Sequence, residues 1–244
     1  MAIVNLGWAS SYFWDGRATS LEEQILEPVS HPDEMALPWD EAVQRLQEMP
    51  TAANDIDYPS RFEHAFETSV VSAELVTKAI AQFLRTMISA DSKFDQWRRG
   101  ETSLTDMEFA GYEMFLREGG DPEITPGGQF GGDCFHCHSE AGLQFSDYLF
   151  RNNGLDSAFT SDPGLAGVTG NTLDSGRFKT PTLRNVALTA PYMHDGRSNT
   201  LREVLNHYSK LPGEPPLGHR EETLQRLRFT EQEMKDLEAF LNSL

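Results

Sequence analysis

The sequence predicts an all-α fold whose helices are joined by long loops. Apolar residues recur at helical spacing in several segments, whereas no segment keeps the strict apolar–polar alternation of a half-buried strand. Start signals of the form Ser/Thr-x-x-Glu precede five of the helical segments, and such capping boxes rarely arise by chance. Clusters of glycine, proline, asparagine and serine separate these segments and indicate loops.

Four helices are expected in the first 90 residues. Ser20-x-x-Glu23 opens a short one that runs through Ile25, and a second, over 39–47, follows Pro38. Ser60-x-x-Glu63 opens a third. The longest starts at Ser72 and runs to about Ser89, and its apolar pairs recur every four residues, so one of its faces is strongly apolar.

Three more helices are expected in the rest of the chain. They begin at Thr105, Thr200 and Thr230, each followed three residues later by glutamate. The last one places Met234, Leu237, Phe240 and Leu241 on a single face. Long loops cover 119–132, 151–182 and 212–218, and a domain boundary is expected around residues 90–102. Loops of this length usually wrap a bound group or carry function.

Composition limits the function classes. The 244 residues suffice for one large or two small domains, and the 39% hydrophobic content suffices for a core. The net charge of −18 argues against non-specific nucleic-acid binding and favours basic protein partners. No apolar run approaches the roughly 20 residues of a membrane span. The first six residues lack the basic flank and cleavage site of a signal peptide.

The strongest motif is Cys-Phe-His-Cys-His at residues 134–138, which contains both cysteines of the chain. In C-x-x-C-H, the thiols of Cys134 and Cys137 can form thioethers with the two vinyl groups of one haem, and His138 then presents its imidazole to the iron. The motif therefore predicts covalent attachment of haem c. Because this attachment takes place outside the cytoplasm in bacteria, we expect a periplasmic protein whose native N-terminus is not Met1.

Two other uses of the cysteines are weaker. A structural zinc site needs two more ligands, and without a second cysteine pair only residues such as His136 and His194 could supply them. A redox disulfide usually occurs in a βαβ context, which the hydrophobic pattern lacks.

The sixth ligand of the iron is open between several residues. Four side chains downstream of the motif are candidates: Met193, His194, His207 and Tyr208. Tyr208 shares the apolar face of its expected helix with Leu201 and Leu205, whereas His207 falls on the solvent side. Tyr208 is thus either a ligand or a core aromatic residue, and Met193 is the main alternative because thioether ligation is common in cytochromes.

Longer segments carry a resemblance to a family. They are FWDGR at 13–17, LEEQ at 21–24 followed by Pro28 and Glu34-Met35, FKTPTLRN at 178–185 and TAPYMHDG at 189–196. In this order around C-x-x-C-H, they resemble the bacterial di-haem cytochrome c peroxidases and their MauG-type relatives. The resemblance covers nearly the whole chain.

The resemblance implies two cytochrome c-like domains, each with its own haem c. Residues 1–90 would form a partial N-terminal domain on the peroxidatic side, and 91–244 a C-terminal haem domain. The first C-x-x-C-H of the family would precede residue 13 by several dozen residues, and this chain has no third cysteine. We therefore expect a single haem c site in these residues.

The resemblance also implies catalytic roles. Glu34 corresponds to the acid–base carboxylate of the peroxide pocket, and Gln24 and Pro28 to other residues of that pocket. Trp14 corresponds to the tryptophan between the haems, a candidate electron relay. Without the resemblance, Glu34 is a surface carboxylate and Trp14 a buried anchor.

Further residues are expected to bind cofactors. Tyr208 corresponds to the sixth-ligand position, which is methionine in the peroxidases and tyrosine in MauG-type members. Arg184 and Lys179 are expected to pair with the haem propionates, with a solvated role as the alternative. Thr189 and Pro191 correspond to backbone-carbonyl ligands of a calcium ion.

The function implied is reduction of hydrogen peroxide with electrons from a small cytochrome c or copper protein, or MauG-like oxidation of a protein partner. A homodimer is also a family expectation. The alternative is a mono-haem electron-transfer cytochrome domain without peroxidase turnover.

Overall fold

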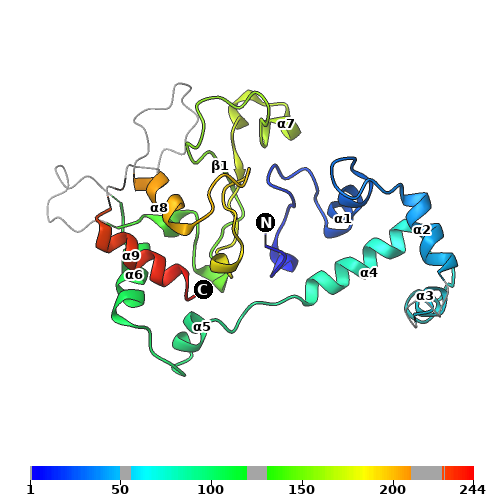
Figure 1. Ribbon diagram of the computed structural model, residues 1–244, viewed down its shortest axis with the longest axis horizontal. Helices are drawn as coiled ribbons and strands as arrows, with labels where there is room; N and C mark the ends of the chain where they lie inside the picture. Colours follow the sequence, from blue (N-terminus) through cyan, green and yellow to red (C-terminus); the bar gives the residue numbers. More distant parts are fainter. Residues whose placement is uncertain (1, 50–55, 120–130, 210–226, 228) are drawn as a thin grey trace. The chain divides into compact units, whose positions relative to one another are not determined.

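The computed structural model describes residues 2–49, 56–119, 131–209, 227 and 229–244 (Figure 1). The chain divides into two compact units. We call Met1–Val4, Phe13–Arg17 and Ser89–Leu244 the motif unit, because it contains C-x-x-C-H, and Asn5–Tyr12 with Ala18–Ile88 the smaller unit. The sequence-based division at residue 90 places 13–17 with the N-terminal half, whereas in the structure this segment clusters with the motif unit.

The smaller unit consists of helices. After the 3₁₀-helix η1 (Leu6–Trp8) come α1 (Leu21–Ser30), α2 (Trp39–Glu48), α3 (Tyr58–Phe66) and α4 (Ala73–Thr86). Ser20 and Ser72 cap α1 and α4 as predicted, each accepting a bond from a backbone N–H of the first turn. Arg85 on α4 forms a two-bond ion pair with Glu22 on α1.

Three details of these helices differ from the prediction. Ser60 does not begin α3, because Asp57 is the cap and accepts a bond from the backbone N–H of Ser60. The helix that starts after Ser20 runs past Ile25 and through Pro28 to Ser30. The longest helix ends at Thr86, three residues before the predicted end.

The motif unit combines helices, 3₁₀ turns and one small ribbon. Its helices are α5 (Lys93–Arg98), α6 (Asp106–Leu116), α7 (Ala166–Thr169), α8 (Leu201–Ser209) and α9 (Glu231–Leu241). Four 3₁₀-helices lie between them: Cys134–His136, Ala141–Leu143, Thr172–Asp174 and Val186–Leu188. Strands β1 (Phe150–Arg151) and β2 (Phe178–Lys179) pair antiparallel, with Phe150 opposite Lys179. The all-α prediction is confirmed, since this ribbon is the only sheet among the described residues.

Capping boxes start the helices of this unit. Thr105 with Glu108 and Thr230 with Glu233 form reciprocal boxes at α6 and α9, and Thr200 with Glu203 does so at α8, as predicted. Helix α5 was not predicted. It is started by a Ser92–Asp95 box, in which aspartate takes the place of the usual glutamate.

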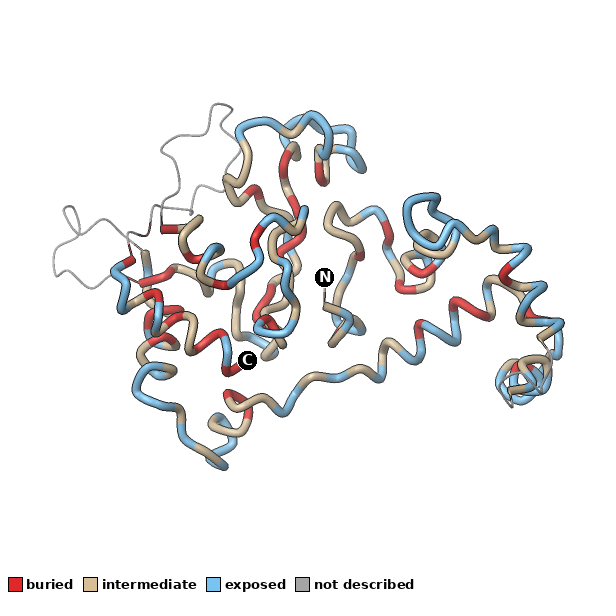
Figure 2. Tube along the Cα trace, viewed as in Figure 1, coloured by how far each residue is buried: buried red, intermediate tan, exposed pale blue. Residues whose placement is uncertain are grey.

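The core of the motif unit lies where α6 and α9 pack side by side (Figures 1 and 2). Gly111 on α6 allows this close approach, because a Cβ there would collide with the backbone carbonyl of Asp236 on α9. The predicted apolar face of α9 is confirmed: Met234, Leu237, Phe240 and Leu241 are all buried. The rings of Phe94, Phe115 and Phe145 pack against the ring of Phe240 at edge-to-face angles.

Among the residues that the structure describes, no helix is long and apolar enough to cross a membrane.

Candidate haem c site

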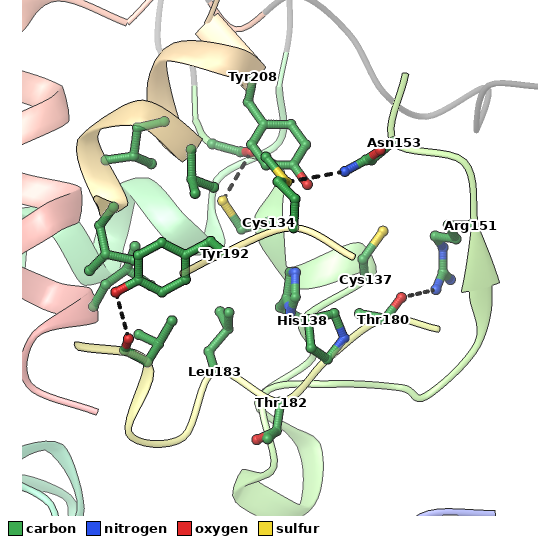
Figure 3. A pocket seen from close by; sticks show the side chains of 18 of the residues that line it. Cys134, Cys137, His138, Arg151, Asn153, Thr180, Thr182, Leu183, Tyr192 and Tyr208 are labelled. Carbon is green, nitrogen blue, oxygen red and sulfur yellow. Dashed lines mark hydrogen bonds between the residues drawn. The ribbon is translucent and has the colours of Figure 1, made fainter. Parts of the chain in front are cut away.

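Cys134, Cys137 and His138 of the C-x-x-C-H motif line one cavity of the motif unit (Figure 3). The cavity measures about 230 Å³. Its walls come from the 3₁₀ turn of the motif, from β2 and the segment after it, and from α8 and α9. Most of the wall is apolar, with Phe115, Leu201 and Leu237 among its members. This is a concave, mainly apolar site with a few convergent polar groups, the usual form of a cofactor site.

His138 is arranged as a metal ligand. Its Nδ1 lies 3.1 Å from the backbone carbonyl oxygen of Phe145, which can only accept a hydrogen bond. The ring therefore carries its lone pair on Nε2, in the orientation that a second-shell carbonyl usually fixes for a ligating histidine. Burial lowers the pKa of His138 below its usual value, so the neutral form that can ligate iron is favoured.

The two cysteines are not joined in a disulfide, and both lie on the wall of the same cavity as His138. The Cys134 thiol is directed to the carbonyl oxygen of Gly132 at 3.2 Å, and burial raises its pKa to about 12. A thiol of this kind is not a reactive redox nucleophile. Two sulfurs and one imidazole on a single apolar cavity fit the attachment of haem c.

The zinc alternative finds no support in the geometry. Among the described residues, His136 groups with Glu118 and Asp133, and His194 groups with Asp156 and Asp195. Neither group includes Cys134 or Cys137. Within the described part of the chain, the ligands that a zinc site would need therefore do not converge.

Tyr208 reaches the cavity from α8, as its place on the apolar face predicted. Burial raises the pKa of its phenol to about 12, and its hydroxyl hydrogen-bonds with the side chain of Asn153 (Figure 3). Met193 also lines the cavity. The structure thus keeps both candidates for the sixth ligand at one site.

His194 and His207, the two histidines among the candidates for the sixth ligand, each make another contact within the protein. His194 stacks on Phe178, with ring centroids 3.7 Å apart, in the cavity wall. His207 is not on the solvent side as predicted: it is half-buried, and its Nε2 bonds the backbone carbonyl oxygen of Asn153 at 3.0 Å. The loop of Asn153 covers the face of α8 that the helical spacing assigned to water.

Trp14 and Lys179 line the cavity together. The backbone N–H of Lys179 donates to the carbonyl oxygen of Trp14 at 2.8 Å, which attaches the FWDGR segment to β2. The Lys179 side chain is buried, and this desolvation lowers its pKa to about 8, against the opposing charge of Asp15.

Arg184 is not among the residues that line the cavity. Its guanidinium is buried and forms two bonds to the carboxylate of Asp95, at 2.5 Å and 2.8 Å. It also donates from Nε to the carbonyl oxygen of Leu143 at 2.6 Å. These bonds engage the guanidinium within the protein, so its expected pairing with a propionate remains a prediction.

The other predicted site residues fall into two groups. Glu34 and Gln24 belong to the smaller unit, where Glu34 is exposed and Gln24 and Pro28 are half-buried. Thr189 and Pro191 lie beside the cavity, and the Thr189 hydroxyl donates to the carbonyl oxygen of Val186 at 3.3 Å. The structure therefore brings Trp14, Thr189 and Pro191 to the C-x-x-C-H cavity.

Two residues that contact the candidate site residues were not identified from the sequence. Asn153 contacts Tyr208 and Met193, and its signal is an Asn-Asn-Gly run, which is typical of turns and gives no hint of a cavity. Asp95 pairs with Arg184 from 89 residues away. Its signal was the Ser92-x-x-Asp95 box, which locates a helix start but not an ion pair.

An all-α unit with C-x-x-C-H on an apolar cavity is typical of a cytochrome c-like domain. The profile of the di-haem cytochrome c peroxidase family matches residues 1–103. Methylamine utilization protein MauG of Methylorubrum extorquens is 34% identical over 244 residues, covering 99% of this chain and 63% of that protein. Cytochrome c551 peroxidase of Nitrosomonas europaea is 32% identical over 250 residues, covering 99% of this chain and 64% of that protein.

A solved structure agrees in fold and in sequence. It is that of a MauG-like protein associated with microbial copper homeostasis, with a TM-score of 0.80 and 32% identity, covering 100% of this chain and 74% of that one. The chain belongs to the di-haem cytochrome c peroxidase and MauG family. It spans a little less than two thirds of the length of the curated relatives described above.

Proposed function

We propose that this chain provides the electron-transfer haem c site of a di-haem peroxidase or MauG-type oxidoreductase. The observation that carries the proposal is the convergence of Cys134, Cys137, His138 and Tyr208 on one apolar cavity. Cys134 and Cys137 would bind the haem vinyl groups as thioethers, and His138 would be the proximal ligand. The haem would supply a one-electron redox centre in this cavity.

Tyr208 is the proposed sixth ligand. Its hydroxyl faces the same cavity as His138 (Figure 3). An anionic oxygen ligand favours ferric iron and so gives a lower reduction potential than a thioether would. This ligand set suits an enzyme that keeps strongly oxidising equivalents for a protein partner, as the MauG-type resemblance implies.

The residues around the cavity have supporting roles in this proposal. Trp14 provides an aromatic ring on the cavity wall and would relay electrons to and from the haem edge. Lys179 is buried on the same wall and would hold a propionate, a role that its position favours over Arg184. Thr189 and Pro191 would offer carbonyl oxygens to a calcium ion, which prefers oxygen ligands.

Hydrogen peroxide is the proposed oxidant. Its reduction consumes two electrons and two protons and releases two water molecules. Glu34 would take a proton from one peroxide oxygen and return it to the leaving oxygen, with Gln24 beside it in the same pocket. The exposure of Glu34 keeps its carboxyl open to proton exchange with water.

Electrons would come from a small cytochrome c or copper protein in the periplasm. The net charge of −18 favours a donor with a basic docking face. We also propose a homodimer, the family expectation.

Haem stoichiometry and turnover test the proposal. The chain is produced where cytochrome maturation operates, and a pyridine haemochrome assay measures its covalent haem. We expect one haem c per chain in the parent and none in the C134S/C137S variant. Colourless parent protein with both thiols free would refute the proposal.

Peroxide turnover separates the two candidate functions. A mono-haem electron-transfer domain is the second candidate, because these 244 residues contain a single C-x-x-C-H. One haem per chain without peroxide-dependent donor oxidation would favour that candidate. Donor oxidation that E34Q abolishes, at unchanged haem content, would favour the peroxidase.

A further inference from the structure

The side chain of Asn153 lies between the two candidates for the sixth ligand. Its Nδ2 donates to the Met193 sulfur at 3.5 Å, and the same side chain hydrogen-bonds with the Tyr208 hydroxyl (Figure 3). All three residues line the cavity of His138. One amide group therefore contacts both side chains that could complete the coordination of an iron held there.

The direction of this amide is fixed by its other contacts. The Asn153 Oδ1 accepts a bond from the backbone N–H of Leu155 at 3.3 Å, which forms an Asx turn. The amide NH₂ is therefore the end that faces Tyr208 and Met193, and it has two hydrogens for these two acceptors.

The loop of Asn153 is also attached to the helix that carries Tyr208. His207 Nε2–H donates to the backbone carbonyl oxygen of Asn153 at 3.0 Å. His207 and Tyr208 are neighbours on α8, so the distance between the Asn153 amide and the Tyr208 oxygen is set by two adjacent contacts. This placement does not depend on the identity of the Asn153 side chain, because His207 bonds the backbone.

We propose that Asn153 is a positioning residue that selects Tyr208 over Met193 as the sixth ligand. The inference rests on the haem c function proposed above. An amide N–H beside a phenol oxygen stabilises the negative charge that this oxygen carries as a ligand of ferric iron. The other N–H engages the Met193 sulfur, and a thioether whose lone pair accepts a hydrogen bond is a poorer ligand.

Two variants of Asn153 remove the donor in complementary ways. N153D keeps an oxygen for the Leu155 N–H, and so keeps the turn, but replaces the NH₂ group by a second acceptor. N153L removes the donor in a side chain of similar shape and adds no charge. The matched control is N171D, because Asn171 forms the same kind of turn with the N–H of Leu173, at 3.1 Å, on an exposed loop.

The readouts are the spectra and the reduction potential of the full chain with its haem. The parent and N171D are expected to show tyrosinate-to-iron charge transfer and no methionine–iron band. N153D and N153L are expected to lose the tyrosinate signal, gain the methionine–iron band and have a higher reduction potential. Adding M193L to either variant should remove the new band.

Other outcomes overturn the proposal. If either variant keeps the tyrosinate signal, or loses it without gaining the methionine band, the selection by Asn153 is refuted. A parent that binds haem without any tyrosinate signal refutes it as well, while the proposed haem c function stands. Failure of that function is seen separately, as a parent without covalent haem in the pyridine haemochrome assay.

Discussion

Arg184 and Asp95 form a buried two-bond ion pair that supports the segment behind His138. Their side chains are only 1% and 3% exposed. The Arg184 Nε also donates to the carbonyl oxygen of Leu143, and two residues further on the carbonyl oxygen of Phe145 accepts the bond from His138. The ion pair thus holds the turn that orients the His138 ring.

Removing Arg184 is expected to destabilise the motif unit strongly. R184Q leaves the Asp95 carboxylate buried without its cation, which costs about 3–5 kcal/mol for a buried pair. Chemical denaturation of the haem-loaded chain measures this loss. The control is R197Q, which breaks the exposed pairs of Arg197 with Asp156 and Asp195 and should cost at most about 1 kcal/mol. Equal losses in the two variants would contradict the role of the buried pair.

The same pair predicts a loss of stability in acid. Burial alone would raise the pKa of Asp95, but the bonds from Arg184 and Ser92 outweigh it and hold this pKa below its usual value. A carboxyl with a lowered folded-state pKa stabilises the protein above its unfolded pKa of about 3.9 and loses this contribution as the pH falls through the folded value. The free energy of unfolding should therefore fall below about pH 4, and more steeply in the parent than in D95N. Parallel pH profiles would refute this assignment.

The sequence predicted the parts of the fold that local chemistry determines. Thr105, Thr200 and Thr230 start helices because their side chains and the glutamates three residues later satisfy the first N–H groups of the same turn. Ser60 failed as a start signal because the helix begins one turn earlier, where Asp57 is the cap and accepts bonds from both the backbone N–H and the hydroxyl of Ser60. Local pattern alone cannot decide between two good caps in one turn.

The candidate site was predictable only where a motif is contiguous. Cys134, Cys137 and His138 could be assigned because their spacing itself encodes the chemistry. The partner of Arg184 and the role of Asn153 could not be assigned from the sequence. Arg184 contacts Asp95, which is 89 residues away, and Asn153 contacts Tyr208, which is 55 residues away, and hydrophobic periodicity does not predict such contacts. His207 shows the same limit: helical spacing gave its face correctly but not the loop that covers this face.

The packing of α6 against α9 is expected to leave no room for a side chain at position 111. The Cβ of G111A would collide with the Asp236 carbonyl at the α6–α9 contact, and overpacking of this kind typically costs 1–3 kcal/mol or more. G7A is the control, because a Cβ there would lie 3.8 Å from the flexible side chain of Arg85. Thermal unfolding of both variants measures the difference. If G111A unfolds at the parent temperature, α6 and α9 do not pack as described.

Lys179 is expected to raise the reduction potential of a haem bound in the cavity. A buried cation on the cavity wall stabilises the reduced, more negative state, and a unit charge in partly buried surroundings contributes roughly 1–2 kcal/mol. For a one-electron couple this corresponds to roughly 40–90 mV, so K179M should have a lower potential by about this amount. The control is K235M, which removes an exposed lysine of α9. A spectroelectrochemical titration in which both variants match the parent would exclude Lys179 from the haem environment.

Loss of the haem is expected to lower the free energy of unfolding of the motif unit by more than the replacement of two thiols alone would. The cavity of about 230 Å³ is lined by apolar side chains that a haem would contact, and empty cavities cost about 24 cal/mol per Å³. The haem-free C134S/C137S variant should therefore unfold with a free energy lower by on the order of 5 kcal/mol. Parent protein made without cytochrome maturation is the control: it keeps both thiols, and it should match the double variant.

Hydrogen exchange of the haem-free forms should rise most in α8, which provides Leu201, Leu205 and Tyr208 to the cavity wall. Haem-free forms as stable as the haem-loaded parent would mean that the cavity collapses without cost and that the haem does not organise this unit.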